Sequence, residues 1–148
     1  MIVYRITLEK WARSLAGSGY PARWNSKGRY VIYTAGSRAL ACLENLAHRT
    51  GEGLDHLFCI IEIKLPEPPS VQTVDPFSLP ENWYHPDAYP FCQAIGDSWI
   101  DMNKSLALRV PSSIIPDEHN ILINPGHPGF RDVIIHSVKP FRFDRRLK

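Results

Sequence analysis

The sequence has few cysteines and no cysteine pair at a spacing that would hold a metal or form a redox motif. Its 148 residues include three cysteines, Cys42, Cys59 and Cys92, and no CxxC segment. They lie far apart in apolar surroundings, which is typical of buried thiols in a reducing compartment. We therefore expect a cytoplasmic protein.

Long hydrophobic runs and a strong excess of one charge are also missing. No uninterrupted apolar segment approaches the ~18 residues that span a membrane, and the start MIVYRI has no basic region followed by an apolar run. The 17 Lys and Arg residues against 15 Asp and Glu residues give a net charge of +2, with the bases scattered except at 142–148. This excess is too small to indicate a nucleic-acid-binding protein, so neither a membrane nor a nucleic acid is an expected partner.

Several common catalytic and metal-binding motifs are absent. There is no GxGxxG, GxxxxGKS, GxxxxGKT or GxSxG segment, which excludes the usual Rossmann, P-loop and α/β-hydrolase sites. The six histidines include no HxxxH pair. Turn or surface roles are therefore favoured for His119, His127 and His136, and no metal site is expected.

The length predicts a single domain over residues 1–148. A domain of this size buries roughly 68 to 70% of the surface that its unfolded chain exposes, which is enough for a core and a pocket. No linker or shift of composition divides the chain. The proline-rich stretch 66–90 is predicted to be mostly loop, a surface insertion around Trp83 and Tyr84.

Strand-like segments become more frequent toward the end of the chain. Runs of β-branched and aromatic residues predict strands at 2–6, 29–33, 57–65, 106–110, 120–123 and 133–143. A short helix capped by Thr7 and a helix over 91–103, interrupted at 96–99, are also predicted. Because helices lie early and strands late without regular βαβ alternation, we expect an α+β fold, a twisted mixed sheet with a few helices.

A further predicted helix places a carboxylate beside a buried face. Ser37 is a good N-cap for this helix, Thr50-Gly51 closes it, and its apolar positions recur at spacings of three and four. Glu44 lies on the flank of this apolar face, so its carboxylate must be paired with a cation, hydrogen-bonded or used in a chemical step. A structural salt bridge to Arg5 or Lys10 is as good an interpretation as a chemical role.

Arg5, Tyr33 and Ser112 stand within or at the ends of apolar strands, where pockets tend to form. An arginine matches phosphate geometry, a tyrosine face stacks on a planar ring, and a carboxylate such as Glu44 stabilises a developing cation. Together these groups suit a pyridine dinucleotide. Each also has a structural interpretation. Arg5 can pair with an acid, Tyr33 can pack in the core, and Ser112 can hydrogen-bond to backbone groups after Pro111. The residues alone therefore predict a pocket for an anion and a ring, and no more.

Seven motifs, in order, resemble those of the RES domain family, which is named for an arginine, a glutamate and a serine. They cover nearly the whole chain, at 4–5, 23–28, 31–35 with 39–44, 96–99, 108–112, 120–125 with 127–128, and 140–147. Carried over by position, the three named residues fall on Arg5, Glu44 and Ser112, and Tyr33 matches the tyrosine that lines the same pocket. Arg23 is a competing arginine, but its place in an Arg-Trp-Asn loop fits a loop-anchoring role better.

The resemblance implies a fold similar to ADP-ribosyltransferases of the diphtheria-toxin type and an enzyme that acts on NAD. In such an enzyme Glu44 faces the nicotinamide ribose and stabilises the positive charge that builds as the bond to nicotinamide breaks. Arg5 holds the pyrophosphate or ribose and Tyr33 packs on the nicotinamide. Ser112, rather than the adjoining Ser113, hydrogen-bonds to the ribose or the amide. The acceptor stays open between water, phosphate and a protein side chain.

The resemblance also implies a partner. Such domains are usually the toxin of a bacterial type II toxin–antitoxin pair, and an antitoxin with an Xre-type helix-turn-helix domain would block the pocket near Arg5 and Glu44, with Trp83 and Tyr84 at its rim. A non-catalytic module that holds a nucleotide or a partner peptide in the same pocket is the alternative. The intact set of four pocket residues favours the enzyme, because a pure binder has no need of a carboxylate beside an anionic ligand.

Overall fold

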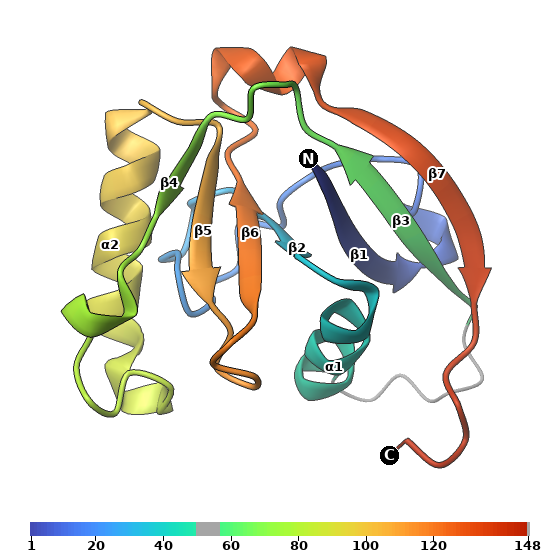
Figure 1. Cartoon of the computed structure of the whole chain (residues 1–148), viewed down its shortest axis with the longest axis horizontal. Coiled ribbons are helices and arrows are strands. Elements are labelled where there is room, and N and C mark those ends of the chain that lie inside the picture. The colour runs from blue at the N-terminus through green and yellow to red at the C-terminus, as the bar shows by residue number, and fades with distance from the viewer. Residues whose placement is uncertain (50–56, 148) are drawn as a thin grey trace.

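The computed structural model describes residues 1–49 and 57–147, in which one mixed sheet carries two α-helices (Figure 1). The seven strands follow the order β4-β5-β6-β2-β1-β3-β7. Their bounds are β1 Ile2–Leu8, β2 Ile32–Ala35, β3 Phe58–Lys64, β4 Val71–Thr73, β5 Ala107–Pro111, β6 His119–Ile123 and β7 Ile134–Phe141, and the helices are α1 Arg38–His48 and α2 Tyr89–Met102. Strands β4 and β5 pair in parallel and the other neighbours are antiparallel. The expected α+β class with a mixed sheet is confirmed.

The sheet opens between β1 and β2. These two strands share one aligned pair, Tyr4 with Ala35, whereas β1 aligns along its whole length with β3. Strand β2 diverges from β1 beyond this contact, and α1 lies beside the junction (Figure 1). Side chains from both strands can therefore border a common space next to α1, which a continuous ladder would have closed.

Each helix covers a different part of the sheet. Apolar residues of α1, Leu40 and Ala41, pack with Ile6, Phe58 and Ile60 of β1 and β3. The apolar face of α2 packs instead against the β5 and β6 side, in a cluster that contains Cys92, Trp99, Leu108, Val110 and Leu122. The β-branched run of β3 is buried on both faces, which accounts for its near-continuous apolar sequence.

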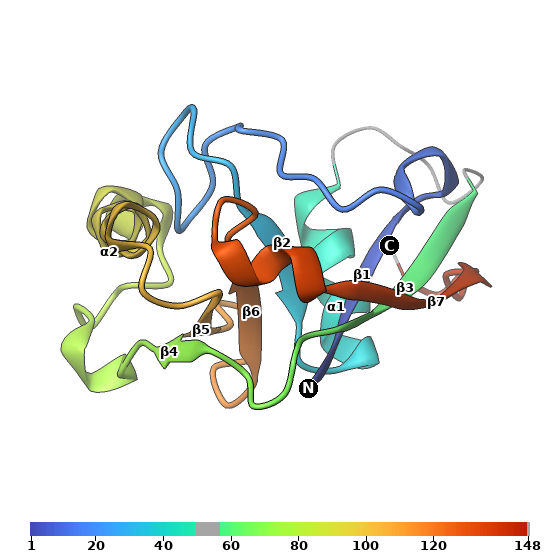
Figure 2. The ribbon, with the colours of Figure 1, turned by 90° about the horizontal axis from the view of Figure 1, so that it is seen from above.

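The loop before β2 reaches from one side of the molecule to the other. Residues 12–31 run from the end of β1 toward α2 and return to β2 (Figure 2). Side chains of α2 hold the far end of this loop: Gln93 Nε2 donates to the Ala22 carbonyl over 2.9 Å, and Asp97 Oδ1 accepts from the Ser26 amide over 3.0 Å. The loop is thereby fixed beside the opening of the sheet.

Two predicted elements are confirmed in detail and one is displaced. Ser37 caps α1, since its Oγ accepts from the Leu40 amide over 3.1 Å, while the predicted closure at Thr50-Gly51 lies outside the described residues. Strand β3 occupies the predicted run. Strand β2 begins at Ile32 rather than at residue 29, because Asn25 Nδ2 binds the Arg29 carbonyl over 3.0 Å and keeps it in the loop.

The prediction of a helix capped by Thr7 is wrong. Thr7 aligns with Cys59 in the β1–β3 ladder, and β1 continues to Leu8. A single 3-10 turn, Glu9–Trp11, follows. The long ladder with β3 satisfies the backbone groups that a helix would have needed, so pairing between distant segments overrides the local capping signal.

Two expectations about the second half of the chain are also corrected. Helix α2 is continuous through Gly96, which lets the helix approach the loop: a Cβ on Gly96 would lie 1.6 Å from the Trp24 carbonyl oxygen. Trp83 is 9% exposed and packs in a core cluster with Trp24 rather than lying on a surface insertion, whereas Tyr84 is 48% exposed. The stretch 66–90 supplies β4 and two 3-10 turns as well as loop.

Candidate active site

A cavity of about 290 Å³ opens where β1 and β2 diverge. Its walls come from β1, β2, α1, the loop before β2 and the ends of β5 and β6. Three of the four residues expected at the site, Arg5, Tyr33 and Glu44, border this cavity. Ser112 lies directly behind it, and its neighbour Ser113 borders it. The structure therefore brings together residues that the sequence places far apart.

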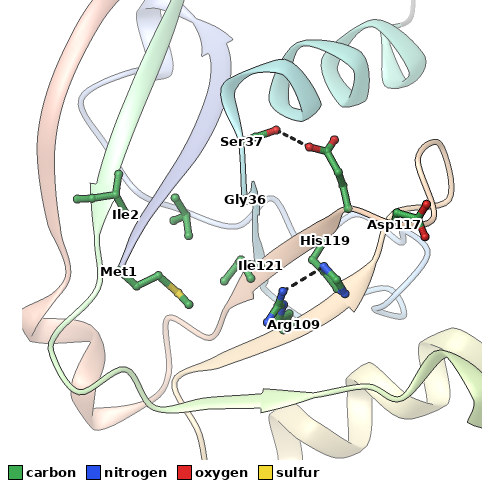
Figure 3. Close-up of a pocket in the computed structure, with 10 residues that line it drawn as sticks. Met1, Ile2, Gly36, Ser37, Arg109, Asp117, His119 and Ile121 are labelled. Atoms are coloured by element: carbon green, nitrogen blue, oxygen red, sulfur yellow. Dashed lines mark hydrogen bonds between the residues drawn. The ribbon is translucent and has the colours of Figure 1, made fainter.

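A second cavity, of about 350 Å³, lies near the start of the chain (Figure 3). Arg109 and His119 face each other there, with an Arg109 guanidinium nitrogen 3.2 Å from His119 Nδ1. Burial, together with the charge of Arg109, lowers the pKa of His119, so a neutral imidazole can accept this hydrogen bond. Ser37 donates to Glu118 Oε1 over 3.1 Å beside it. None of the four expected site residues borders this second cavity.

Glu44 is held by three neighbours on the first cavity. Its Oε1 accepts hydrogen bonds from Asn120 Nδ2 at 2.6 Å and from Ser112 Oγ at 3.0 Å. Its Oε2 lies 3.3 Å from His48 Nε2, one helical turn further along α1. Burial acts to raise the pKa of Glu44, but the hydrogen bonds from His48, Asn120 and Ser112 outweigh it and hold the pKa below its usual value. The carboxylate is therefore ionised at neutral pH and fixed in direction.

The side chain that pairs with Glu44 differs from the two considered from the sequence. Its carboxylate pairs with His48, and among residues 1–49 and 57–147 neither Arg5 nor Lys10 forms a salt bridge with it. The side chain of Glu44 is 18% exposed. The Glu44 carboxylate is thus shielded from solvent, and the imidazole beside it comes from the same helix.

Ser112 uses its whole hydrogen-bonding capacity inside the protein. It has no exposed surface, and its hydroxyl donates to Glu44 while accepting the amides of Ile114 at 3.0 Å and Ile115 at 3.1 Å. A hydroxyl offers one donor and two acceptor positions, so all are occupied. Ser112 therefore fixes the carboxylate and tightens the turn after β5.

Tyr33 is likewise held by its polar end. Its hydroxyl donates to Asn25 Oδ1 over 2.6 Å and accepts the Trp24 amide over 3.2 Å. Asn25 is 2% exposed and binds carbonyls of its own loop, including that of Tyr20 at 2.9 Å. Burial strongly raises the pKa of Tyr33, so the hydroxyl stays neutral. The aromatic ring is the part of Tyr33 left to meet a ligand.

Two arginines border the cavity, and they differ in the hydrogen bonds that their guanidinium groups make. Among the residues that the structure describes, the guanidinium of Arg5 makes one long contact, 3.4 Å to the Ala16 carbonyl, and burial lowers its pKa. The guanidinium of Arg23 donates to the carbonyls of Trp83 and Tyr84, each at 2.7 Å, and to that of His85 at 3.3 Å. These contacts agree with the loop-anchoring role expected for Arg23. Arg5 has more donor groups left for an anionic ligand.

Sequence reasoning did not identify two contacts of Glu44. His48 follows Glu44 by four residues on a helix, so the i, i+4 spacing was a signal that could have identified it. Asn120 lies 76 residues from Glu44 along the chain, and no local pattern indicates their contact. The sheet order, which brings β6 next to β2, is what places Asn120 at the cavity.

Two searches of the part of the chain that the structure describes concern metal-ligand clusters and membrane-length helices. No group of three or more His, Cys, Asp or Glu side chains there could hold a metal ion. No described helix is both long and apolar enough to cross a membrane.

The chain matches the RES domain family model over residues 2–146. It belongs to the RES domain family. The match covers both walls of the cavity, from β1 to the segment that follows β7.

Curated relatives of this RES domain protein are toxins by name. It is 37% identical over 154 residues to Toxin Res of Yersinia enterocolitica, with 100% of both chains covered. It is 35% identical over 141 residues to the Prs ADP-ribosylating toxin of Sphingobium sp. (strain YBL2), covering 92% of this chain and 88% of that one.

A solved structure shares the fold. The RES domain protein superimposes on a chain of the M. tuberculosis MbcT-MbcA toxin–antitoxin complex with a TM-score of 0.74, covering 95% of this chain and 84% of the other. The two sequences are 19% identical, so this likeness concerns the fold.

Proposed function

We propose that this RES domain protein is the NAD-consuming toxin of a toxin–antitoxin pair and that it cleaves the bond between nicotinamide and ribose. The observation that carries the proposal is the state of Glu44: an ionised carboxylate, held by Ser112 and Asn120 at a cavity that also presents an arginine and an aromatic ring. The names of the curated relatives, toxins in general and an ADP-ribosylating toxin in particular, support it.

The proposed chemistry depends on a charge that develops on the sugar. As the bond from C1′ to nicotinamide breaks, the ribose acquires oxocarbenium character, and a fixed carboxylate stabilises this state more than it stabilises the bound substrate. Nicotinamide leaves as a neutral ring, so no strong general acid is needed. Glu44 would supply the electrostatic stabilisation.

The other cavity residues would position NAD. Arg5 would bind the pyrophosphate or a ribose, because within 1–49 and 57–147 its guanidinium makes only the long contact to the Ala16 carbonyl. The ring of Tyr33 would pack against the nicotinamide, with its hydroxyl tied to Asn25. Ser112 would act through Glu44, since its hydroxyl is saturated, and this replaces the direct ribose contact expected from the resemblance.

The test is to incubate the purified protein with NAD and to separate the products by chromatography. Nicotinamide with free ADP-ribose means hydrolysis, nicotinamide with ADP-ribose phosphate means phosphorolysis, and nicotinamide with labelled protein means transfer. If nicotinamide is not released with water, phosphate or cell extract as acceptor, the enzyme proposal fails, and NAD binding without release would favour the non-catalytic module.

We further propose that an antitoxin with an Xre-type helix-turn-helix domain blocks the cavity. The fold it shares with a chain of a toxin–antitoxin complex supports a partner of this kind. Tyr84 stays a candidate for the rim because it is half exposed and its carbonyl is held by Arg23 at the cavity wall, whereas Trp83 is buried. Expression of this chain alone should arrest bacterial growth, and the neighbouring gene should relieve the arrest. Unaltered growth and NAD content at good soluble levels of the lone chain would contradict both proposals.

A further inference from the structure

His48 borders the cavity beside Glu44 and has no task in the chemistry described so far. Four side chains of α1 line the cavity, Ala41, Glu44, Asn45 and His48, and their spacings of three and four place them on one face of the helix. The His48 side chain is 67% exposed, so its imidazole touches both the cavity and the solvent.

A cavity that cleaves NAD with a neutral acceptor works faster with a base. When water or a hydroxyl group attacks C1′, its oxygen must lose a proton, and Glu44 is poorly suited to take it. The hydrogen bonds on Glu44 lower its pKa, which makes the carboxylate a weak base, and both of its oxygens already face donors. Among the described residues that border the cavity, His48 supplies the one imidazole, the side chain best suited to general base catalysis near neutral pH.

We propose that His48 is the general base for an uncharged acceptor, water or a hydroxyl group, and that Glu44 orients it. This inference rests on the proposed NAD cleavage. Because a carboxylate oxygen only accepts hydrogen bonds, Nε2 carries a proton toward Glu44 Oε2, 3.3 Å away, and Nδ1 is left as the basic nitrogen. No hydrogen bond to Nδ1 is found within 1–49 or 57–147, and the largely exposed imidazole borders the cavity, so the proposal assigns the acceptor to this nitrogen.

The step balances as a displacement at C1′. The acceptor oxygen forms a bond to C1′ as the bond from C1′ to nicotinamide breaks, and nicotinamide leaves as a neutral molecule with the bonding electron pair. The proton of the acceptor passes to Nδ1 of His48, which becomes an imidazolium next to the ionised Glu44, and is later lost to water. Glu44 would orient the imidazole throughout this transfer, as an oriented carboxylate does beside a catalytic histidine.

Reaction with an anionic nucleophile distinguishes a general base role of His48 from a purely structural role. Azide attacks C1′ without losing a proton, so it requires Glu44 but no base. We would compare wild type with His48→Gln, whose amide can still donate to Glu44 Oε2 but is no base, and with the control His136→Gln on the exposed face of β7. Nicotinamide release is measured in water alone and with added azide, and the ADP-ribosyl product is identified by mass.

The expected result is a loss of hydrolysis of about 10²- to 10⁴-fold in His48→Gln, with azide-dependent release near the wild-type rate and no change in His136→Gln. Equal losses of rate in water and in azide would overturn the proposal, because His48 would then act only by holding the Glu44 carboxylate in place. Near-normal hydrolysis by His48→Gln, or a wild type that reacts only with azide or phosphate, would overturn it too. A wild type that releases no nicotinamide under any of these conditions contradicts the proposed function itself, which keeps the two failures apart.

Discussion

Asn120 donates to Oε1 of Glu44 over 2.6 Å, so a residue of β6 fixes a residue of α1 that lies 76 positions earlier. Glu44 is held from two sides, by this strand and by its own helix through His48. A carboxylate fixed in this way is oriented before any ligand arrives, which is the condition under which electrostatic stabilisation of a transition state is most effective.

Replacement of Glu44 by glutamine should abolish most of the NAD cleavage while leaving the fold intact. The amide preserves the shape but cannot oppose a developing cation, and losing one such group commonly lowers the rate by ~10²- to 10³-fold. Nicotinamide release measures the effect, and circular dichroism checks the fold. The matched control is Glu118→Gln, a carboxylate that also accepts a serine hydrogen bond but borders the other cavity. Near-normal turnover in Glu44→Gln would refute the assigned role.

Replacement of Asn120 by leucine should raise the pKa of Glu44. Asn120 is one of the donors that lower this pKa, and its loss therefore raises it. The chemical shift of the Glu44 carboxyl carbon, followed by NMR against pH, measures the change without interference from the proposed base His48. His119→Gln, the adjacent residue facing the other cavity, should leave this titration in place. A Glu44 titration that does not move in Asn120→Leu would contradict the role of Asn120 in lowering this pKa.

Replacement of Arg5 should weaken NAD binding, measured by calorimetry in the Glu44→Gln background so that the ligand survives. Arg5→Ala removes the bidentate phosphate partner, and Arg5→Lys should restore affinity only partly, since an ammonium group lacks the planar fork. Arg13→Ala, an exposed arginine outside the cavity, is the control. Equal affinities for the alanine, lysine and unchanged proteins would place Arg5 among the purely structural residues.

Replacement of Gly96 by alanine should destabilise the protein through a clash between α2 and the loop before β2. The new Cβ would meet the Trp24 carbonyl at 1.6 Å, so the helix or the loop must move, and such overpacking typically costs about 1 to 3 kcal/mol or more. Urea unfolding measures the change, with Ser98→Ala on the exposed side of α2 as control. Because Trp24 also binds the Tyr33 hydroxyl, NAD binding should weaken as well. Unchanged unfolding midpoints would show that the loop can move away from the new Cβ at no cost in stability.

The sequence predicted those parts of the fold that local patterns determine. The capped helix α1 and the apolar strand β3 follow from signals within a few residues, and both are present. The supposed helix after Thr7 and the exposed Trp83 were wrong because distant partners decide them: β3 pairs with Thr7, and a core cluster with Trp24 encloses Trp83. In the same way, the position of Glu44 was predictable, whereas its contact with Asn120 depends on the sheet order.

The narrow junction between β1 and β2 also has a consequence for hydrogen exchange. Arg5 stands on one half of the sheet and Tyr33 on the other, and the two halves meet along β1 and β2 at the single aligned pair Tyr4 and Ala35. A dinucleotide that contacts both residues would bridge the two halves of the sheet. It would add noncovalent contacts across a seam, the junction of β1 and β2, that has little backbone pairing of its own. Bound substrate should therefore slow amide exchange most strongly along this seam, and the protection factors of β1 and β2 would report occupancy without any chemistry taking place.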